Sequence, residues 1–141
     1  MAFEGSYRMC ALPDSLTTEE VGARWSKTRL LACIMNPLPA IADGDWRAAL
    51  AEAWNHWTAL IPLDFDFTTT ARLADALHYV GTIDGSGKTL AWSELPSGAD
   101  SPLKQKYDSG ESWSVGLPVP ANKIDVVAVV THELGHLLGL G

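Results

Sequence analysis

Cysteine and positive charge are both scarce in this sequence. Its 141 residues include two cysteines, Cys10 and Cys33, too few for the disulfide framework of a small secreted domain. The 10 Lys and Arg residues are outnumbered by 17 Asp and Glu residues, which gives a formal net charge of -7, and no basic cluster interrupts this acidity. Nucleic acid is therefore not an expected partner, whereas carboxylates can bind hard cations such as calcium.

Long apolar runs are lacking as well, so the sequence predicts no membrane-spanning segment. Residues 1–20 contain charged residues such as Glu4, Arg8 and Asp14, and so do not form a signal peptide. The protein is then either cytosolic or carries its signal outside these residues. With 47% hydrophobic and 19% charged residues, the chain suits one globular domain with a single core.

Sequence periodicity predicts several strands and an early helix. Strands are expected over residues 30–35, 63–68, 77–83 and 89–92, where apolar residues run together or alternate with polar ones. The early helix is expected to be capped by Asp43 or Asp45. It buries apolar residues spaced three or four apart: Trp46, Ala49, Leu50, Ala53, Trp54 and Trp57.

The second half of the chain is predicted to hold a long loop and a late helix. Residues 96–123 are rich in Gly, Pro, Ser and Asp and indicate an irregular connection. Residues 124–138 form the late helix, capped near Asn122 and followed by Gly139. These strands and two helices indicate an α+β domain.

The late helix carries the motif His132-Glu133-Leu134-Gly135-His136. Residues four apart lie on one face of a helix, roughly 6 Å from each other, so both imidazoles can bind one zinc ion. Glu133 lies beside them, where a carboxylate can act as general base on a water that the metal activates. The motif predicts metal-assisted hydrolysis of an amide bond.

A catalytic zinc needs a third protein ligand. In the pattern H-E-x-x-H-x-x-G-x-x-H, Gly139 occupies the glycine position and the third histidine falls directly after Gly141. The sequence is therefore interpreted as ending at a truncation boundary, with a C-terminal subdomain lacking.

On these residues the sequence resembles the matrixin family of metzincin zinc endopeptidases, which includes the matrix metalloproteinases. Residues 25–30, 57–65 and 90–96 also resemble the family's first strand, first helix and substrate-binding edge strand. The resemblance implies a catalytic domain over residues 23–141 with a twisted mixed β-sheet, an early amphipathic helix and a C-terminal zinc-binding helix. It also implies a secreted enzyme with protein or peptide substrates, which would lie against Leu90 and Ala91.

Residues 1–22 resemble the end of the family's propeptide, the cysteine-switch segment. The resemblance implies that the Cys10 thiolate binds the catalytic zinc and keeps a zymogen latent. Met9 and Ala11 depart from the family pattern, which has arginine and glycine there. An ordinary thiol, or a disulfide between Cys10 and Cys33, is the alternative.

A structural calcium site is a second implication of the resemblance. Its ligands would be the carboxylates of Asp84, Asp108 and Glu111 and backbone carbonyls, because oxygen ligands suit calcium. The carbonyls would come from Gly85, Gly87 and Thr89. Turn chemistry in a solvated acidic loop is the alternative. The family's structural zinc is expected to be lost, because Trp92 and Lys106 occupy the positions of its histidines.

Two histidines outside the motif, His56 and His78, are interpreted as surface or packed residues. Two other functions stay open: a zinc peptidase of another clan whose third ligand is a distant glutamate, and a non-catalytic binding domain of the same fold. Gly139 argues against the first, and the intact Glu133 argues against the second.

Overall fold

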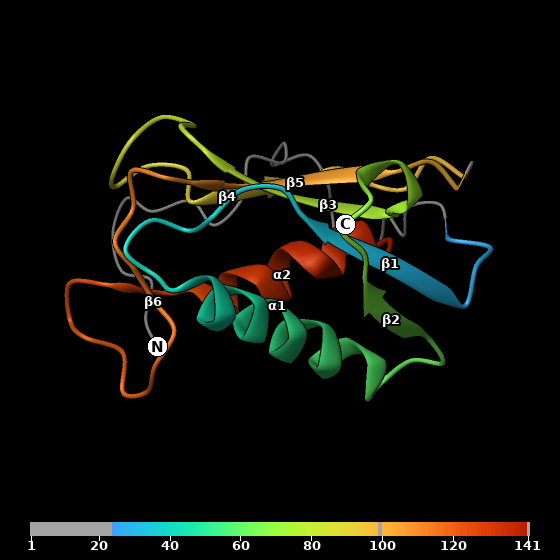
Figure 1. Cartoon of the computed structure of the whole chain (residues 1–141), viewed down its shortest axis with the longest axis horizontal. Coiled ribbons are helices and arrows are strands. Elements are labelled where there is room, and N and C mark those ends of the chain that lie inside the picture. The colour runs from blue at the N-terminus through green and yellow to red at the C-terminus, as the bar shows by residue number, and fades with distance from the viewer. Residues whose placement is uncertain (1–23, 99, 141) are drawn as a thin grey trace.

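The computed structural model describes residues 24–98 and 100–140 (Figure 1). Its elements follow in chain order as β1 (Arg29–Ile34), α1 (Asp43–Thr58), β2 (Asp64–Phe67), the short 3₁₀ helix η1 (Ala71–Leu73), β3 (Ala76–Gly81), β4 (Ala91–Ser93), β5 (Leu103–Asp108), β6 (Trp113–Ser114), β7 (Ile124–Asp125) and α2 (Val126–Leu137).

A five-stranded mixed sheet forms one layer of the domain. The strand order is β2-β1-β3-β5-β4, with all neighbours parallel except the antiparallel pair β4 and β5. Both long helices lie on one side of this sheet (Figure 1). The predicted α+β class with a mixed sheet, an early helix and a late helix is therefore confirmed.

The core lies between the sheet and the two helices. The predicted apolar stripe of α1 is buried at Trp46, Ala49, Leu50, Ala53 and Trp54, while Trp57 is partly buried at the edge of the core. Trp54 stacks on Phe65 of β2 with ring centroids 5.3 Å apart. Burial of such large aromatic surfaces drives helix and sheet together and fixes where α1 crosses the sheet.

The predicted cap of α1 is wrong. Ala42 is the N-cap residue and makes no side-chain capping bond, while Asp43 and Asp45 lie inside the first turn. Carboxylates in the first turn still favour the helix, because they interact with the positive end of its dipole.

The prediction of an irregular connection over residues 96–123 is wrong for its central part. Residues 103–108 form β5, an interior strand of the sheet. Its inward positions are Leu103, Gln105 and Tyr107, all buried, and the outward Lys104 is exposed. The alternation is regular, but a polar Gln at the middle inward position hides it from a hydrophobicity pattern.

The buried Gln105 belongs to a chain of polar side chains that crosses the interior. Trp54 Nε1 donates to His78 Nε2 at 3.2 Å, so the proton of this imidazole lies on Nδ1, which is 3.3 Å from the Tyr107 hydroxyl. Tyr107 donates to Gln105 Oε1 at 2.6 Å, and Gln105 Nε2 donates to Ser93 Oγ at 3.2 Å. Each polar side chain in this buried chain thus has a hydrogen-bond partner, as burial requires.

Candidate functional site

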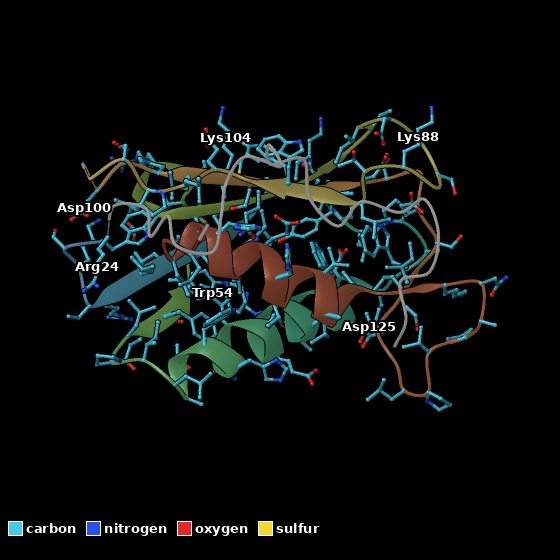
Figure 2. All side chains as sticks on the ribbon, turned by 180° about the vertical axis from the view of Figure 1, so that it is seen from behind. Arg24, Trp54, Lys88, Asp100, Lys104 and Asp125 are labelled. Carbon is cyan, nitrogen blue, oxygen red and sulfur yellow. The ribbon has the colours of Figure 1, made fainter. Side chains whose placement is uncertain are left out.

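The helix α2 holds the motif residues on a rigid support. Its valines Val126, Val127, Val129 and Val130 are buried before the motif begins. The Asp125 side chain caps the helix by accepting a hydrogen bond from Val127 N at 3.1 Å, and Figure 2 labels Asp125 at this end of α2. The predicted cap near Asn122 is therefore wrong, because residues 124 and 125 first form the short strand β7.

The two motif histidines face each other across one turn of α2. Their Nε2 atoms lie 3.1 Å apart, and the ring planes cross at 86°. Two nitrogens bound tetrahedrally at the usual zinc distance are about 3.3 Å apart. The observed separation therefore fits two ligands of one metal ion.

His136 is held in the tautomer that a zinc ligand needs. Its Nδ1 lies 2.8 Å from the carbonyl oxygen of Leu140, which can only accept a hydrogen bond. The proton therefore lies on Nδ1, and the lone pair of Nε2 is directed to the metal position. Such a hydrogen bond to the far ring nitrogen is how proteins orient metal-binding imidazoles.

Gly139 makes this contact possible by turning the chain back at the end of α2. It has φ +108°, a conformation that L side chains rarely adopt. Gly139 N donates to His136 O at 3.0 Å, and Leu140 N donates to Gly135 O at 2.9 Å. This pair of bonds is a Schellman motif, so the glycine predicted to end the helix also carries Leu140 to His136.

Glu133 is fully buried between the two histidine positions, while His132 is exposed and His136 is 8% exposed. Burial, and next the charge of Glu133, raise the pKa of Tyr107 well above its usual range. The carboxylate therefore sits in a largely water-excluded environment, where its interactions with nearby charges are strong.

Among the described residues, no three His, Cys, Asp or Glu side chains are grouped to hold a metal ion. The candidate zinc site therefore has two ligands among the described residues, His132 and His136. The proposed latent-state ligand Cys10 lies outside the described residues, and Cys33 is a free, buried thiol of β1.

The two halves of the candidate calcium site lie together. Asp108 Oδ2 accepts from Asp84 N at 3.2 Å and from Gly85 N at 3.0 Å, and Glu111 Oε1 accepts from Gly87 N at 2.8 Å. The carboxylate of Asp84 in turn accepts from Thr89 N at 3.1 Å. The loop after β3 and the loop after β5 are thus tied to each other through carboxylates.

These carboxylates also crowd one another. Burial raises the pKa of Glu111, and the charges of Asp108 and Asp84 raise it further. The hydrogen bond from the backbone N–H of Gly87 offsets this only in part. Burial would likewise raise the pKa of Asp108, but four backbone N–H groups outweigh it and leave the pKa lowered. A carboxylate oxygen that accepts one N–H still has a lone pair for a cation. The three carboxylates nevertheless do not form a metal-holding group among the described residues, so calcium binding at these loops stays a prediction.

Ala91 begins β4, the strand at the edge of the sheet next to α2, and Leu90 directly precedes this strand. β4 is the last strand in the sheet order, and it packs against α2. The side chains of Leu90 and Ala91 are fully buried, and Leu90 O accepts from Asp108 N. The Leu90 carbonyl is thus directed to β5, and only backbone groups of β4 that face away from β5 are suited to pair with an added peptide strand.

The remaining histidines are packed or peripheral. His78 is fully buried in the core, and His56 is exposed. Trp92 and Lys106 are direct partners in the β4–β5 pairing, so two side chains that do not bind zinc face each other there.

Two contacts of the zinc helix were not predicted from the sequence. Trp25 Nε1 donates to Leu137 O at 2.9 Å, and Trp57 Nε1 donates to Thr131 O at 2.8 Å. Trp57 was predicted as part of an apolar stripe, and no local pattern reveals that an indole N–H reaches a helix distant in sequence.

Comparison with known proteins gives consistent matches. Matrix metalloproteinase-C of Caenorhabditis elegans is 30% identical over 142 residues, which cover 91% of this chain and 23% of the relative. Human matrix metalloproteinase-16 is 30% identical over 136 residues, covering 84% of this chain and 22% of the relative. Metalloendoproteinase 1-MMP of Arabidopsis thaliana is 30% identical over 132 residues, covering 84% and 35%.

The chain thus spans roughly a quarter to a third of the length of these relatives. A model of the matrixin family matches residues 24–141, which include the whole described sheet, both helices and the His132–His136 motif. Together with the paired imidazoles at the end of α2, this match shows that the chain belongs to the matrixin family.

Proposed function

We propose that this protein is a zinc-dependent endopeptidase that hydrolyses peptide bonds in proteins or peptides. The observation that carries the proposal is the pair of Nε2 atoms 3.1 Å apart on a buried helix, with the fully buried Glu133 between them in sequence. Membership of the matrixin family supports it and argues against a zinc peptidase of another clan.

His132 and His136 would hold the zinc ion through Nε2. When bound, zinc supplies Lewis-acid polarisation of a carbonyl and lowers the pKa of a bound water. The bond from His136 Nδ1 to Leu140 O supports this role, because it leaves Nε2 unprotonated.

Glu133 is proposed to move the proton in this reaction. Its carboxylate would accept a proton from the water that attacks the peptide carbonyl, and would then deliver it to the leaving amide nitrogen. A buried carboxylate beside the reaction site is suited to both steps, since water cannot compete for its proton.

The substrate is proposed to lie along the free edge of β4. The backbone of Ala91 would add the peptide as a further strand, close to α2 because β4 and α2 pack together, while the Leu90 carbonyl is already bonded to Asp108 N. Several relatives are named matrix metalloproteinases, which supports extracellular protein substrates and secretion. No helix among the described residues is long and apolar enough to cross a membrane.

Two further parts of the proposal concern control and stability. Cys10 would bind the zinc in a latent zymogen, and residues 1–22 would then be the remaining propeptide segment. Calcium would bind Asp84, Asp108 and Glu111 together with carbonyls of Gly85, Gly87 and Thr89. The shared hydrogen bonds and the crowded carboxylates of these loops support a cation there.

Glu133→Gln tests the central assignment in the longest natural form of the protein. We expect the variant to retain about one zinc per chain and to lose about 10²- to 10⁴-fold in turnover of a generic peptide. Metal content by atomic spectroscopy and cleavage of a quenched fluorescent peptide measure the two effects. Glu52→Gln, at an exposed position of α1, is the matched control.

A non-catalytic binding domain, the alternative function, predicts a different result for Glu133→Gln. In that case the unsubstituted protein binds zinc or peptide but shows no chelator-sensitive cleavage, and Glu133→Gln changes nothing. Near wild-type cleavage by Glu133→Gln would instead end the general-base assignment.

A further inference from the structure

Two tryptophans contact α2 at the two ends of the metal motif. Trp57, near the end of α1, donates its indole N–H to Thr131 O at 2.8 Å. Trp25, which precedes β1, donates its indole N–H to Leu137 O at 2.9 Å. Thr131 and Leu137 are the residues directly before His132 and directly after His136. The five-residue motif is therefore bracketed by two indole hydrogen bonds from distant parts of the chain.

The contact from Trp57 depends on Gly135 inside the motif. A Cβ atom at Gly135 would lie 3.0 Å from Trp57 Cζ2 and 3.5 Å from Cη2, so the indole lies against bare helix backbone. The Thr131 hydroxyl separately donates to Val127 O at 2.7 Å, so Thr131 is bonded both within α2 and to the indole of Trp57. Gly135 thus has a packing reason to be glycine, despite the cost of glycine within a helix.

The contact from Trp25 completes the end of the helix. The last carbonyls of a helix have no partner within it, and terminal turns fray. Here Gly135 O accepts from Leu140 N, and His136 O accepts from Gly139 N. The carbonyl of Leu137 accepts from Trp25, a residue 112 positions earlier in the sequence. His136 lies in this last turn, so its position depends on these bonds.

We propose that Trp25 and Trp57 are positioning residues that hold the His132 and His136 imidazoles at the separation required by zinc. The proposal rests on the proposed zinc function. Two imidazoles on successive turns share a metal only while the turn between them keeps its shape. Metal affinity depends on how far the ligands are preorganised. Bonds to the carbonyls on both sides of the motif fix that turn against α1 and against the segment before β1.

The test removes the N–H group of each indole and keeps its shape. Trp25 and Trp57 are replaced one at a time by benzothienylalanine, in which sulfur takes the place of the indole nitrogen. The longest natural form of the protein is titrated with zinc against a coloured chelator, and kcat and KM are measured for a peptide. We expect roughly tenfold weaker zinc binding in each variant, the order seen when outer contacts of metal ligands are lost. We also expect lower kcat at saturating zinc, with little change in KM.

Trp46 provides the matched control. Its indole N–H donates to Asn36 O at 3.1 Å, a side-chain-to-backbone bond of the same kind that lies outside α2. The same replacement at Trp46 should lower the melting temperature and leave zinc affinity unchanged. If the three replacements change zinc affinity equally, or not at all, the two tryptophans are structural only and the proposal is wrong.

A second variant avoids the unnatural amino acid. Gly135→Ala should displace the Trp57 ring and weaken zinc binding, whereas Gly44→Ala in α1, where a Cβ atom meets nothing within 4 Å, should not. Equal zinc affinities of these two variants would also overturn the proposal. The proposed function fails separately: an unsubstituted protein that binds no zinc overturns both ideas, while one that binds zinc and cleaves peptide leaves only the tryptophans in question.

Discussion

At the scale of single residues, the hydrogen-bond partners of two buried histidines, His136 and His78, distinguish their roles, which the sequence alone does not. His136 has one ring nitrogen bonded to a carbonyl, and the other faces the Nε2 of His132. His78 has both ring nitrogens engaged, with Trp54 on one side and Tyr107 on the other. The first arrangement brings two imidazole nitrogens together as a metal site requires, whereas both nitrogens of His78 are bonded to other side chains of the core.

His78 should make the fold sensitive to acid. Burial, only partly offset by the Gln105 side chain, lowers the pKa of His78 to about 3, from 6.5 when unfolded. The unfolded chain therefore binds the extra proton between these values, so the stability contribution of neutral His78 is complete above pH 6.5 and is lost as pH falls toward 3. We expect the free energy of unfolding to fall by about 1 kcal/mol per pH unit between pH 6 and 4.5.

Urea unfolding at several pH values measures this slope, with and without His78→Gln. The substitution keeps a polar, hydrogen-bonding side chain that does not titrate. His56→Gln, at an exposed position, is the control and should leave the slope unchanged. A slope that is the same in His78→Gln as in the unsubstituted protein would show that His78 is protonated in the folded state or that other groups dominate.

At the scale of elements, the sequence predicted the strands and helices whose inward positions are apolar, and failed where they are polar. The strand β1, the helix α1 and the helix α2 follow from runs or stripes of Leu, Ala, Trp and Val. β5 was assigned to a loop because Gln105 faces inward between charged Lys104 and Lys106. Gln105 is satisfied there only by Tyr107 and Ser93, contacts that exist after the sheet forms.

The candidate site shows the same division. The spacing of His132, Glu133, His136 and Gly139 was readable because a helix converts spacing directly into geometry. The indole bonds from Trp25 and Trp57 were not, since they join segments 112 and 74 positions apart. The contact between the Leu140 carbonyl and His136 Nδ1 depends on the turn at Gly139. The sequence predicted this turn from the glycine, but it did not predict that the turn brings the Leu140 carbonyl to His136.

The paired loops after β3 and β5 are expected to bind calcium and thereby stabilise the sheet. Binding to the folded state alone raises stability by mass action. Millimolar calcium should raise the melting temperature of the unsubstituted protein, and Asp108→Ala combined with Glu111→Ala should abolish the rise. Differential scanning calorimetry in calcium and in a calcium chelator measures this effect.

Asp64→Ala combined with Asp66→Ala is the control, because these exposed carboxylates of β2 lie on the far edge strand of the same sheet. This pair should leave the calcium response intact. Identical melting temperatures of the unsubstituted protein in calcium and in chelator would remove the calcium assignment.

At the scale of the whole molecule, the candidate active site is assembled from distant segments. The helix α2 carries the two motif histidines, α1 and the segment before β1 donate hydrogen bonds to its backbone, and β4 packs beside it.

Cys10 should restrain activity in the unprocessed protein. A thiolate is a strong zinc ligand and would fill the position that the catalytic water needs. We expect Cys10→Ser to raise the peptidase activity of the unprocessed form, and a thiol-reactive mercurial to do the same to the unsubstituted form. Cys33→Ser controls for the second thiol. Equal activity of the Cys10→Ser and unsubstituted forms, with neither cleaved, would count against the switch.

Residues 1–141 by themselves should show little peptidase activity, and a longer form with a histidine directly after Gly141 should show more. The helix α2 supplies two zinc ligands, His132 and His136, where a catalytic site needs three. The spacing H-E-x-x-H-x-x-G-x-x-H places a third histidine directly after Gly141. Within the 141 residues Cys10 is the candidate third ligand, and a site with that ligand is latent.

The comparison measures zinc per chain and turnover of a generic peptide for residues 1–141 and for the longer form, before and after removal of residues 1–22. We expect near-stoichiometric zinc and chelator-sensitive cleavage only in the longer, processed form. Robust cleavage by residues 1–141, blocked by a zinc chelator, would show that the third ligand lies elsewhere in the chain.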